Sequence, residues 1–186
     1  ASTGAITSDG AIDDGNGAAA TMVTLDAGTF TNQANGSVAG VVVASNAAGV
    51  VADGGSFGGI VLNDASTLAI NAATTAAITN NSSVTLNLSS ANAINGDFTQ
   101  QSGQTDNAAA ITGGLTMTNG TFNQNATGSF STASTATGGT LNVNGGAFNG
   151  GLTVSDTVTF NITNSVTGDI TNGGVVANDG VTFTID

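Results

Sequence analysis

The sequence predicts an all-β solenoid, a fold in which short strands stack coil upon coil along one axis. One phrase recurs: Gly113-Gly114 begins an alternating run that ends with Phe122, and Gly138-Gly139 begins a similar run, about two dozen residues later, that ends with Phe148. A short strand, a Gly/Asn corner and a second strand, repeated at such an interval, are typical of solenoids. Proline is absent from all 186 residues, which suits strands that pair on both sides. At roughly 20 to 26 residues per coil, the chain would form about 6–8 coils.

Alternating apolar residues place the expected strands in order along the chain. Residues 1–20 are the least regular and predict an N-terminal arm or an irregular first coil, whereas 21–186 predict a single solenoid domain. In each strand the apolar residues are expected to face inward and the Thr, Asn and Ser residues outward. The run 72–77 predicts a strand or corner rather than a helix, because no 3.6-residue pattern flanks its two threonines. The first strands are expected at 23–25, 38–43, 60–62, 68–70 and 84–88.

Two short phrases predict the length of a coil. A G-x-F phrase places phenylalanines directly after corners, and a V-T-[LF] phrase recurs at 84–88, 158–162 and 181–185, the last two copies lying about as far apart as the two Gly-Gly runs. A mean of about eight residues between strand starts, with three strands per coil, gives a coil of about 24 residues. Asn-Gly and Gly-Gly pairs form the corners, where positive φ is needed. Asparagines that stack at these corners are expected to hydrogen-bond as ladders.

The composition excludes several classes of function. The chain has no Lys, Arg, His, Cys, Trp or Tyr, and its net charge is −12. Nucleic-acid binding is therefore not expected, because Lys and Arg supply most phosphate contacts, and attraction to an anionic membrane surface is not expected for the same reason. A disulfide scaffold and a Cys/His metal site are impossible. No apolar run is long enough for a membrane span.

The sequence favours a location outside the cell. It begins with Ala1-Ser2-Thr3 rather than Met, as expected of a secreted chain after removal of a signal peptide. The absence of Lys and Arg also removes every cleavage site for trypsin-like proteases.

Catalysis is not expected, and the protein is predicted not to be an enzyme. Paired carboxylates such as Asp13-Asp14 could perform acid–base chemistry, but no His, Lys, Arg, Glu, Cys or Tyr is present to assist them. Ser and Thr nucleophiles likewise lack a His or Lys base. Aspartates at turns more commonly accept hydrogen bonds from backbone N–H groups.

Calcium is the one cofactor that the sequence suggests, because hard cations prefer carboxylate and carbonyl oxygens. Asp9, Asp13 and Asp14 lie among glycines in a segment that resembles a calcium loop loosely, without the spacing or closing Glu of an EF-hand. The alternative is a solvated acidic loop.

Phrases such as Gly28–Asn32 (GTFTN) and Gly138–Val143 (GGTLNV) resemble the repeats of secreted bacterial β-helix proteins, namely autotransporter passengers and filamentous-haemagglutinin-like adhesins. This resemblance implies a right-handed, three-faced parallel β-helix outside the cell, with an adhesive or scaffolding function. The T-x-T pairs at 116–118 and 182–184 resemble the flat threonine faces of ice-binding solenoids. Because they are not repeated at a fixed spacing, ice binding is only an alternative.

Head-to-tail self-assembly is the function predicted from the two ends. The chain runs to its end in an uncapped strand, and an exposed terminal rung of a solenoid is an unpaired edge. We therefore expect a structural subunit of a filament or matrix fibre, or otherwise a fragment of a longer chain. The rival function is an adhesin for glycans or host surfaces, and the rival fold is a pilin-like β-sandwich with a donated strand. The expected interface consists of Val181, Phe183 and Ile185 against Ile6 and Ile12.

Overall fold

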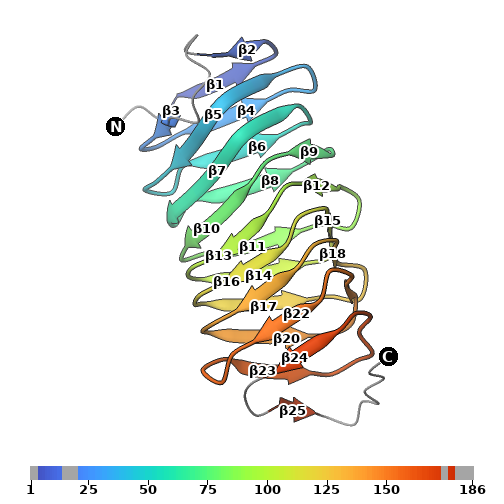
Figure 1. Ribbon diagram of the computed structural model, residues 1–186. Coiled ribbons are helices and arrows are strands. Elements are labelled where there is room, and N and C mark those ends of the chain that lie inside the picture. The colour runs from blue at the N-terminus through green and yellow to red at the C-terminus, as the bar shows by residue number, and fades with distance from the viewer. Residues whose placement is uncertain (1–3, 14–20, 173–175, 179–186) are drawn as a thin grey trace.

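The computed structural model describes residues 4–13, 21–172 and 176–178. Every regular element among them is a strand, and every paired strand runs parallel to its neighbours. The chain forms a β-solenoid of about eight turns, consistent with a right-handed parallel β-helix (Figure 1). The predicted fold class is confirmed. The alternative β-sandwich is wrong, because sandwiches of that kind are built from antiparallel pairs.

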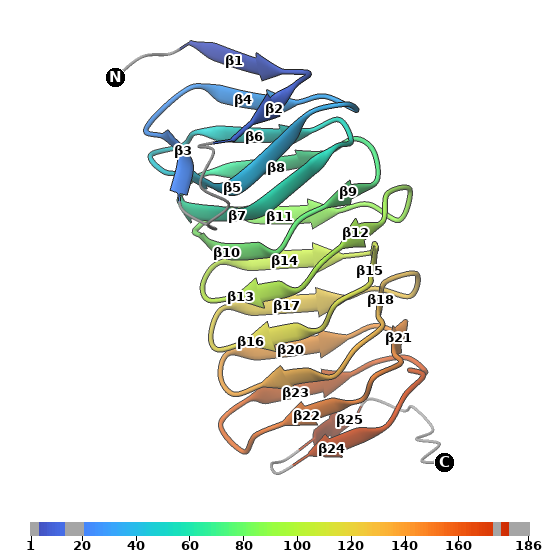
Figure 2. The same cartoon turned by 45° about the horizontal axis from the view of Figure 1, so that its top comes forward.

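Three faces surround the axis, and the chain visits them in the same order in every coil (Figures 1 and 2). What we call the first face consists of two neighbouring sheets, and β8 and β11 lie adjacent where they meet. Its strands are β1 (Ala5–Ser8), β4 (Thr29–Asn32), β6 (Gly49–Ala52), β8 (Thr67–Ile70), β11 (Thr85–Leu88), β14 (Gln104–Asn107), β17 (Thr121–Gln124), β20 (Thr140–Val143), β23 (Thr159–Ile162) and β25 (Val176–Asn178).

The second and third faces belong to one sheet, because two long strands continue around the corner between them. These are β5 (Ser37–Ala44) and β7 (Ser56–Asp64). The second face otherwise contains β2 (Ala11–Ile12), β9 (Thr74–Thr75), β12 (Ile94–Asn95), β15 (Ala110–Ile111), β18 (Ser129–Phe130) and β21 (Ala147–Phe148). The third face otherwise contains β3 (Thr21–Leu25), β10 (Ile78–Ser82), β13 (Phe98–Gln100), β16 (Leu115–Met117), β19 (Ser134–Ala136), β22 (Leu152–Val154) and β24 (Ile170–Asn172).

Most coils are shorter than the sequence predicts. On the first face, Asp106, Asn123, Asn142 and Asn161 pair in register from coil to coil. They are separated in turn by 17, 19 and 19 positions along the chain. The expected coil of about 24 residues is therefore wrong for most of the stack. The reason is that later strands of the second face are only two residues long and the corners are tight.

Differences in coil length are concentrated at the corner between the first and second faces. In four successive coils this corner consists of residues 89–93, 108–109, 125–128 and 144–146, which are five, two, four and three residues. The corners between the third and first faces are more uniform, with residues 101–103, 118–120 and 137–139 in the same region. The first face therefore keeps its register from coil to coil while the corner that follows it varies.

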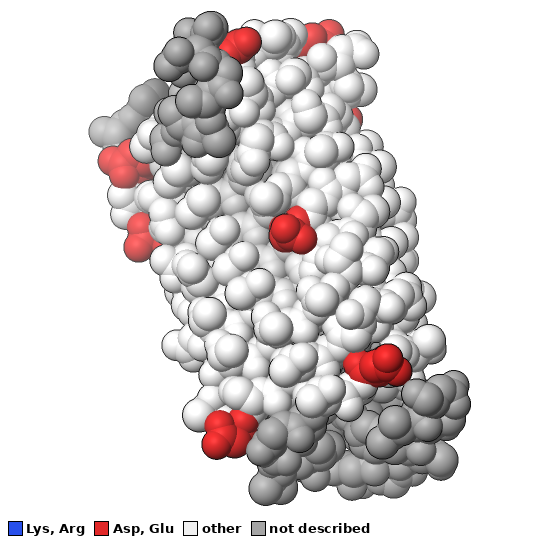
Figure 3. Space-filling view, viewed as in Figure 1, with Lys and Arg blue, Asp and Glu red and all other residues white. Residues whose placement is uncertain are grey.

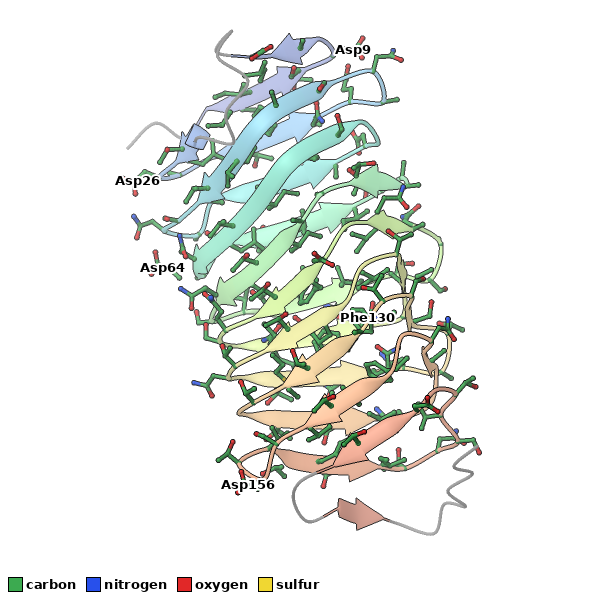
Figure 4. All side chains as sticks on the ribbon, viewed as in Figure 1. Asp9, Asp26, Asp64, Phe130 and Asp156 are labelled. Atoms are coloured by element: carbon green, nitrogen blue, oxygen red, sulfur yellow. The ribbon has the colours of Figure 1, made fainter. Side chains whose placement is uncertain are left out.

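Stacked phenylalanines form much of the core. The G-x-F phrase places its phenylalanine inward, and each described phenylalanine is buried. The ring of Phe122 packs against that of Phe98 at 5.6 Å and against that of Phe130 at 5.8 Å between centroids. Phe130 then stacks on Phe148 at 5.5 Å, and Figure 4 shows Phe130 inside the stack. The common direction of the rings follows from the alternation of side chains along a strand.

The glycine of this phrase is needed where the chain turns tightly. Gly146 has a φ of 90°, and a Cβ atom there would lie 2.4 Å from the carbonyl oxygen of Gly128 in the neighbouring coil. Any other residue would be strained by φ and would collide with that backbone.

Some polar side chains face inward, contrary to the expectation that Thr, Asn and Ser lie outside. The amide Nδ2 of Asn80 donates to Thr105 Oγ1 at 2.9 Å and to Gln100 Oε1 at 3.3 Å. Thr105 Oγ1 also donates to Gln100 Oε1 at 2.6 Å, and all three residues are fully buried. Such burial is tolerated because each side chain has partners within the cluster. Side chains thus alternate between the inside and the outside as expected, but some of the inward side chains are polar.

Replacing Asn80 tests how much this inward cluster stabilises the fold. We expect Asn80→Ala to lower the free energy of unfolding by about 1–3 kcal/mol, because Thr105, Gln100 and the backbone N–H of Ser82 each lose a buried partner. Asn81→Ala is the control, since Asn81 is the next residue but is exposed. Urea unfolding followed by circular dichroism measures both. If both substitutions lowered the free energy of unfolding equally, the buried cluster would not be the source of the stabilisation.

Candidate functional site

The N-terminal end of the stack exposes part of the core. Ile6 occupies the inward position of β1 and pairs with Phe30, which is fully buried in the next coil. Ile6 is nevertheless 51% exposed and is the one exposed large hydrophobic side chain among the described residues. Ile12 of β2 pairs with Val38 and is partly buried against the core. The two predicted N-terminal interface residues therefore lie in inward columns of the first coil.

The other half of the predicted assembly interface lies outside the described residues. Val181, Phe183 and Ile185 belong to this part of the chain. The last strands that the structure describes are β24, which pairs with β22, and β25, which pairs with β23.

The predicted calcium ligands are not brought together as a described site. Asp9 lies in the turn between β1 and β2, Asp13 directly follows β2, and both residues are exposed. Asp14 lies outside the described residues. The described part of the chain contains no group of three or more residues suited to hold a metal ion. Calcium binding stays a prediction.

A different pair of carboxylates is linked by the stacking of coils. Asn46 donates from its side-chain amide to Asp26 Oδ1, and its backbone N–H donates to Asp64 Oδ2 at 3.3 Å. Figure 4 shows Asp26 and Asp64 at the same edge of the rod. These residues lie in or next to three successive corners and are far apart in the sequence, so only the coil register could have revealed the arrangement. Asn46 thus joins the two carboxylates through two different N–H groups.

An asparagine ladder runs along the outside of the first face. Asn161 Nδ2 donates to Asn142 Oδ1 at 2.7 Å, and Asn142 Nδ2 donates to Asn123 Oδ1 at 2.7 Å. The ladder ends at Asp106, whose carboxylate accepts from Asn123 Nδ2 and from Gln104 Nε2. The sequence predicts asparagine ladders at the corners, whereas this ladder lies within strands β17, β20 and β23. Its hydrogen bonds satisfy these amides within the protein.

A threonine ladder runs along the outside of the third face. Its members occupy the same position in β10, β13, β16, β19, β22 and β24, and each pairs with the next across the coils. The intervals between them along the chain are unequal, and this variation conceals the ladder in the sequence. The threonine ladder consists of Thr79, Thr99, Thr116, Thr135, Thr153 and Thr171.

The surface is polar and carries its charges singly. Figure 3 shows carboxylates scattered over one side of the rod, most of which is uncharged. Because every described phenylalanine is buried, the described surface offers no aromatic ring on which a sugar could stack. No helix that could span a lipid bilayer occurs in the part of the chain that the structure describes.

No family model, no curated protein and no solved structure matches this chain at a significant level. The function of this protein is therefore inferred from its residues and their arrangement. The resemblance to autotransporter passengers and haemagglutinin-like adhesins stays a hypothesis.

A substitution within the asparagine ladder tests whether its hydrogen bonds stabilise the rod. Asn142→Asp removes the amide that donates to Asn123 while keeping the size of the side chain. We expect the free energy of unfolding to fall by about 1 kcal/mol, because two acceptors would then face each other. Asn149→Asp, at an exposed corner, makes the same change in charge without breaking a ladder. The interpretation fails if both variants unfold at the same urea concentration.

Proposed function

We propose that this protein is a non-catalytic structural subunit that joins end to end with further copies outside the cell, forming a filament or matrix fibre. The observation that carries the proposal is the exposure of Ile6, a side chain in an inward column of the first coil. Residues in such a column are normally covered by the coil above. A second copy stacked on this end would supply that coil.

The first strand also offers backbone groups for pairing. Among the described strands, β1 pairs with β4 alone, and the later strands of this face pair in succession along their sheets. An unpaired strand edge presents N–H and C=O groups that another chain can use to extend the sheet. Burying a whole isoleucine side chain contributes about 1.5–3 kcal/mol, so covering Ile6 would add to the backbone pairing. Both contributions favour addition of a coil along the axis.

The composition supports a structural role in an extracellular setting. Acid–base or nucleophilic catalysis would have to proceed without His, Lys, Arg, Cys, Tyr or Glu anywhere in the chain. Trypsin-like proteases have no Lys or Arg at which to cut. A rod without Lys or Arg suits a fibre exposed to secreted trypsin-like proteases.

A charge placed at Ile6 tests the end-to-end contact. We expect the wild-type protein to form fibres of the width of one rod in negative-stain electron microscopy, and Ile6→Asp to remain as single particles. The reason is that a carboxylate would be buried without a partner in the interface. Thr7→Asp is the matched control, because it adds the same charge to the same strand at an exposed residue that is not in the inward column.

Further measurements check the fold of both variants and test whether a metal ion bridges the copies. Circular dichroism must show that both variants remain β-rich, and Thr7→Asp must still form fibres. Fibres joined by strand edges and apolar contact should persist in a calcium chelator, whereas their loss would indicate metal bridging. A wild-type protein that sediments as a monomer at every concentration would overturn the proposal.

Salt should promote the assembly. Each copy carries a net charge of −12 and has no basic side chain to offset it, so copies repel one another. Raising the ionic strength from 0.01 M to 0.15 M shortens the Debye length from about 30 Å to about 8 Å, which screens this repulsion. Light scattering should therefore show faster fibre growth in NaCl. Slower growth at higher salt would contradict this account.

A further inference from the structure

The threonine ladder is one column of a two-column array on the third face. The second column lies two positions after each threonine, near or just past the C-terminal end of the strand, and its members are exposed or half-buried. Thr116 pairs with Thr135 in the next coil, and Thr118 and Thr137 each directly follow the last paired residue of their strand. The members of the second column are Asn81, Gln101, Thr118, Thr137 and Ser155.

The array has two regular spacings. Neighbouring strands lie about 4.7–4.9 Å apart, and outward residues of one strand lie about 6.6 Å apart. Successive strands of the third face run side by side along the rod (Figure 1). The array therefore presents hydroxyl and amide groups at two approximate spacings.

The hydroxyl groups of the threonine ladder are available to a ligand. None of the six forms a side-chain hydrogen bond with another described residue. Four of them, in β16, β19, β22 and β24, are exposed, and Thr79 and Thr99 are half-buried. On the first face, by contrast, the amides of Asn142 and Asn161 bond within their own ladder. The threonine ladder thus offers unused hydroxyls in a repeating pattern, whereas Thr118 and Thr137 of the second column donate to backbone carbonyl oxygens of the preceding coil.

Charge and side-chain chemistry limit what can occupy this array. Neither column contains a charged residue, so it offers no ion pair to an ionic ligand. Sugar polymers are commonly held by aromatic rings, which are absent from the two columns. A partner that fits must be neutral, able to donate and accept hydrogen bonds, and periodic in two directions.

Ice has these properties, and its spacing is close to that of the array. In a tetrahedral network with O–H···O distances of about 2.75 Å, oxygens that share a neighbour lie about 4.5 Å apart. That distance is near the spacing between coils. In the perpendicular direction the tetrahedral network repeats at about 7.3 Å, across two layers. This repeat differs by about a tenth from the spacing of about 6.6 Å between outward residues along a strand.

We propose that the two-column array of the third face binds ice. Its hydroxyls and methyl groups would order water in the spacing of the ice lattice, so that the rod adsorbs flat on a crystal and slows its growth. The site lies on the side of the rod and does not require end-to-end assembly.

A bulky residue in the middle of the array tests the proposal. Wild-type protein should separate the melting and freezing points of a small ice crystal and shape the crystal. Thr135→Tyr should abolish most of that separation, because the ring would hold the lattice away from its neighbours. Thr140→Tyr is the control: it makes the same change at an outward position of the first face, and tyrosine is well tolerated in strands.

A third variant separates this proposal from the fibre proposal. Ile6→Asp, which blocks the end contact, should retain crystal shaping, because Ile6 lies far along the stack from Thr135. Circular dichroism must show an unchanged fold for each variant. An inactive wild-type protein, or equal losses in Thr135→Tyr and Thr140→Tyr, would overturn ice binding while leaving the fibre proposal untouched.

Discussion

Continuous parallel pairing of the backbone is the constraint on which the rest of the structure depends. The chain carries a net charge of −12 and has no basic side chain, so its side chains cannot form ion pairs. Cohesion comes instead from ladders in which a strand such as β17 bonds to β14 on one side and β20 on the other. Because buried backbone groups need partners, each coil must keep the register of the coil before it. Proline would interrupt such a ladder, and none is present.

The same register creates aligned columns inside and outside the rod. Inside, it brings Phe122 beside Phe98 and gathers Asn80, Gln100 and Thr105 into one buried cluster. Outside, it aligns asparagines on the first face and threonines on the third. The first alignment satisfies its own hydrogen bonds, whereas the second leaves hydroxyls unused. Two faces built on one backbone plan therefore have different chemistry.

The sequence was sufficient for the solenoid, its strands and the inward phenylalanines, because alternation and the G-x-F phrase depend on neighbouring residues. The coil length could not be predicted from the sequence, because two-residue strands such as β12 leave almost no periodic signal. Nor could the inward position of Asn80, whose partner Thr105 is 25 residues away. The link between Asp26 and Asp64 and the alignment of Thr116 with Thr135 were missed for one reason: both require the register of coils of unequal length.

The corner between the first and second faces varies from two to five residues in successive coils, while both flanking faces stay aligned. Insertions and deletions in this corner are thus absorbed locally, without a shift of the ladders. An evolving lineage can lengthen it freely, and a protein engineer can do the same. Peptides grafted into successive corners of this kind would be displayed in a single file, about 4.7–4.9 Å apart per coil, along one edge of the rod.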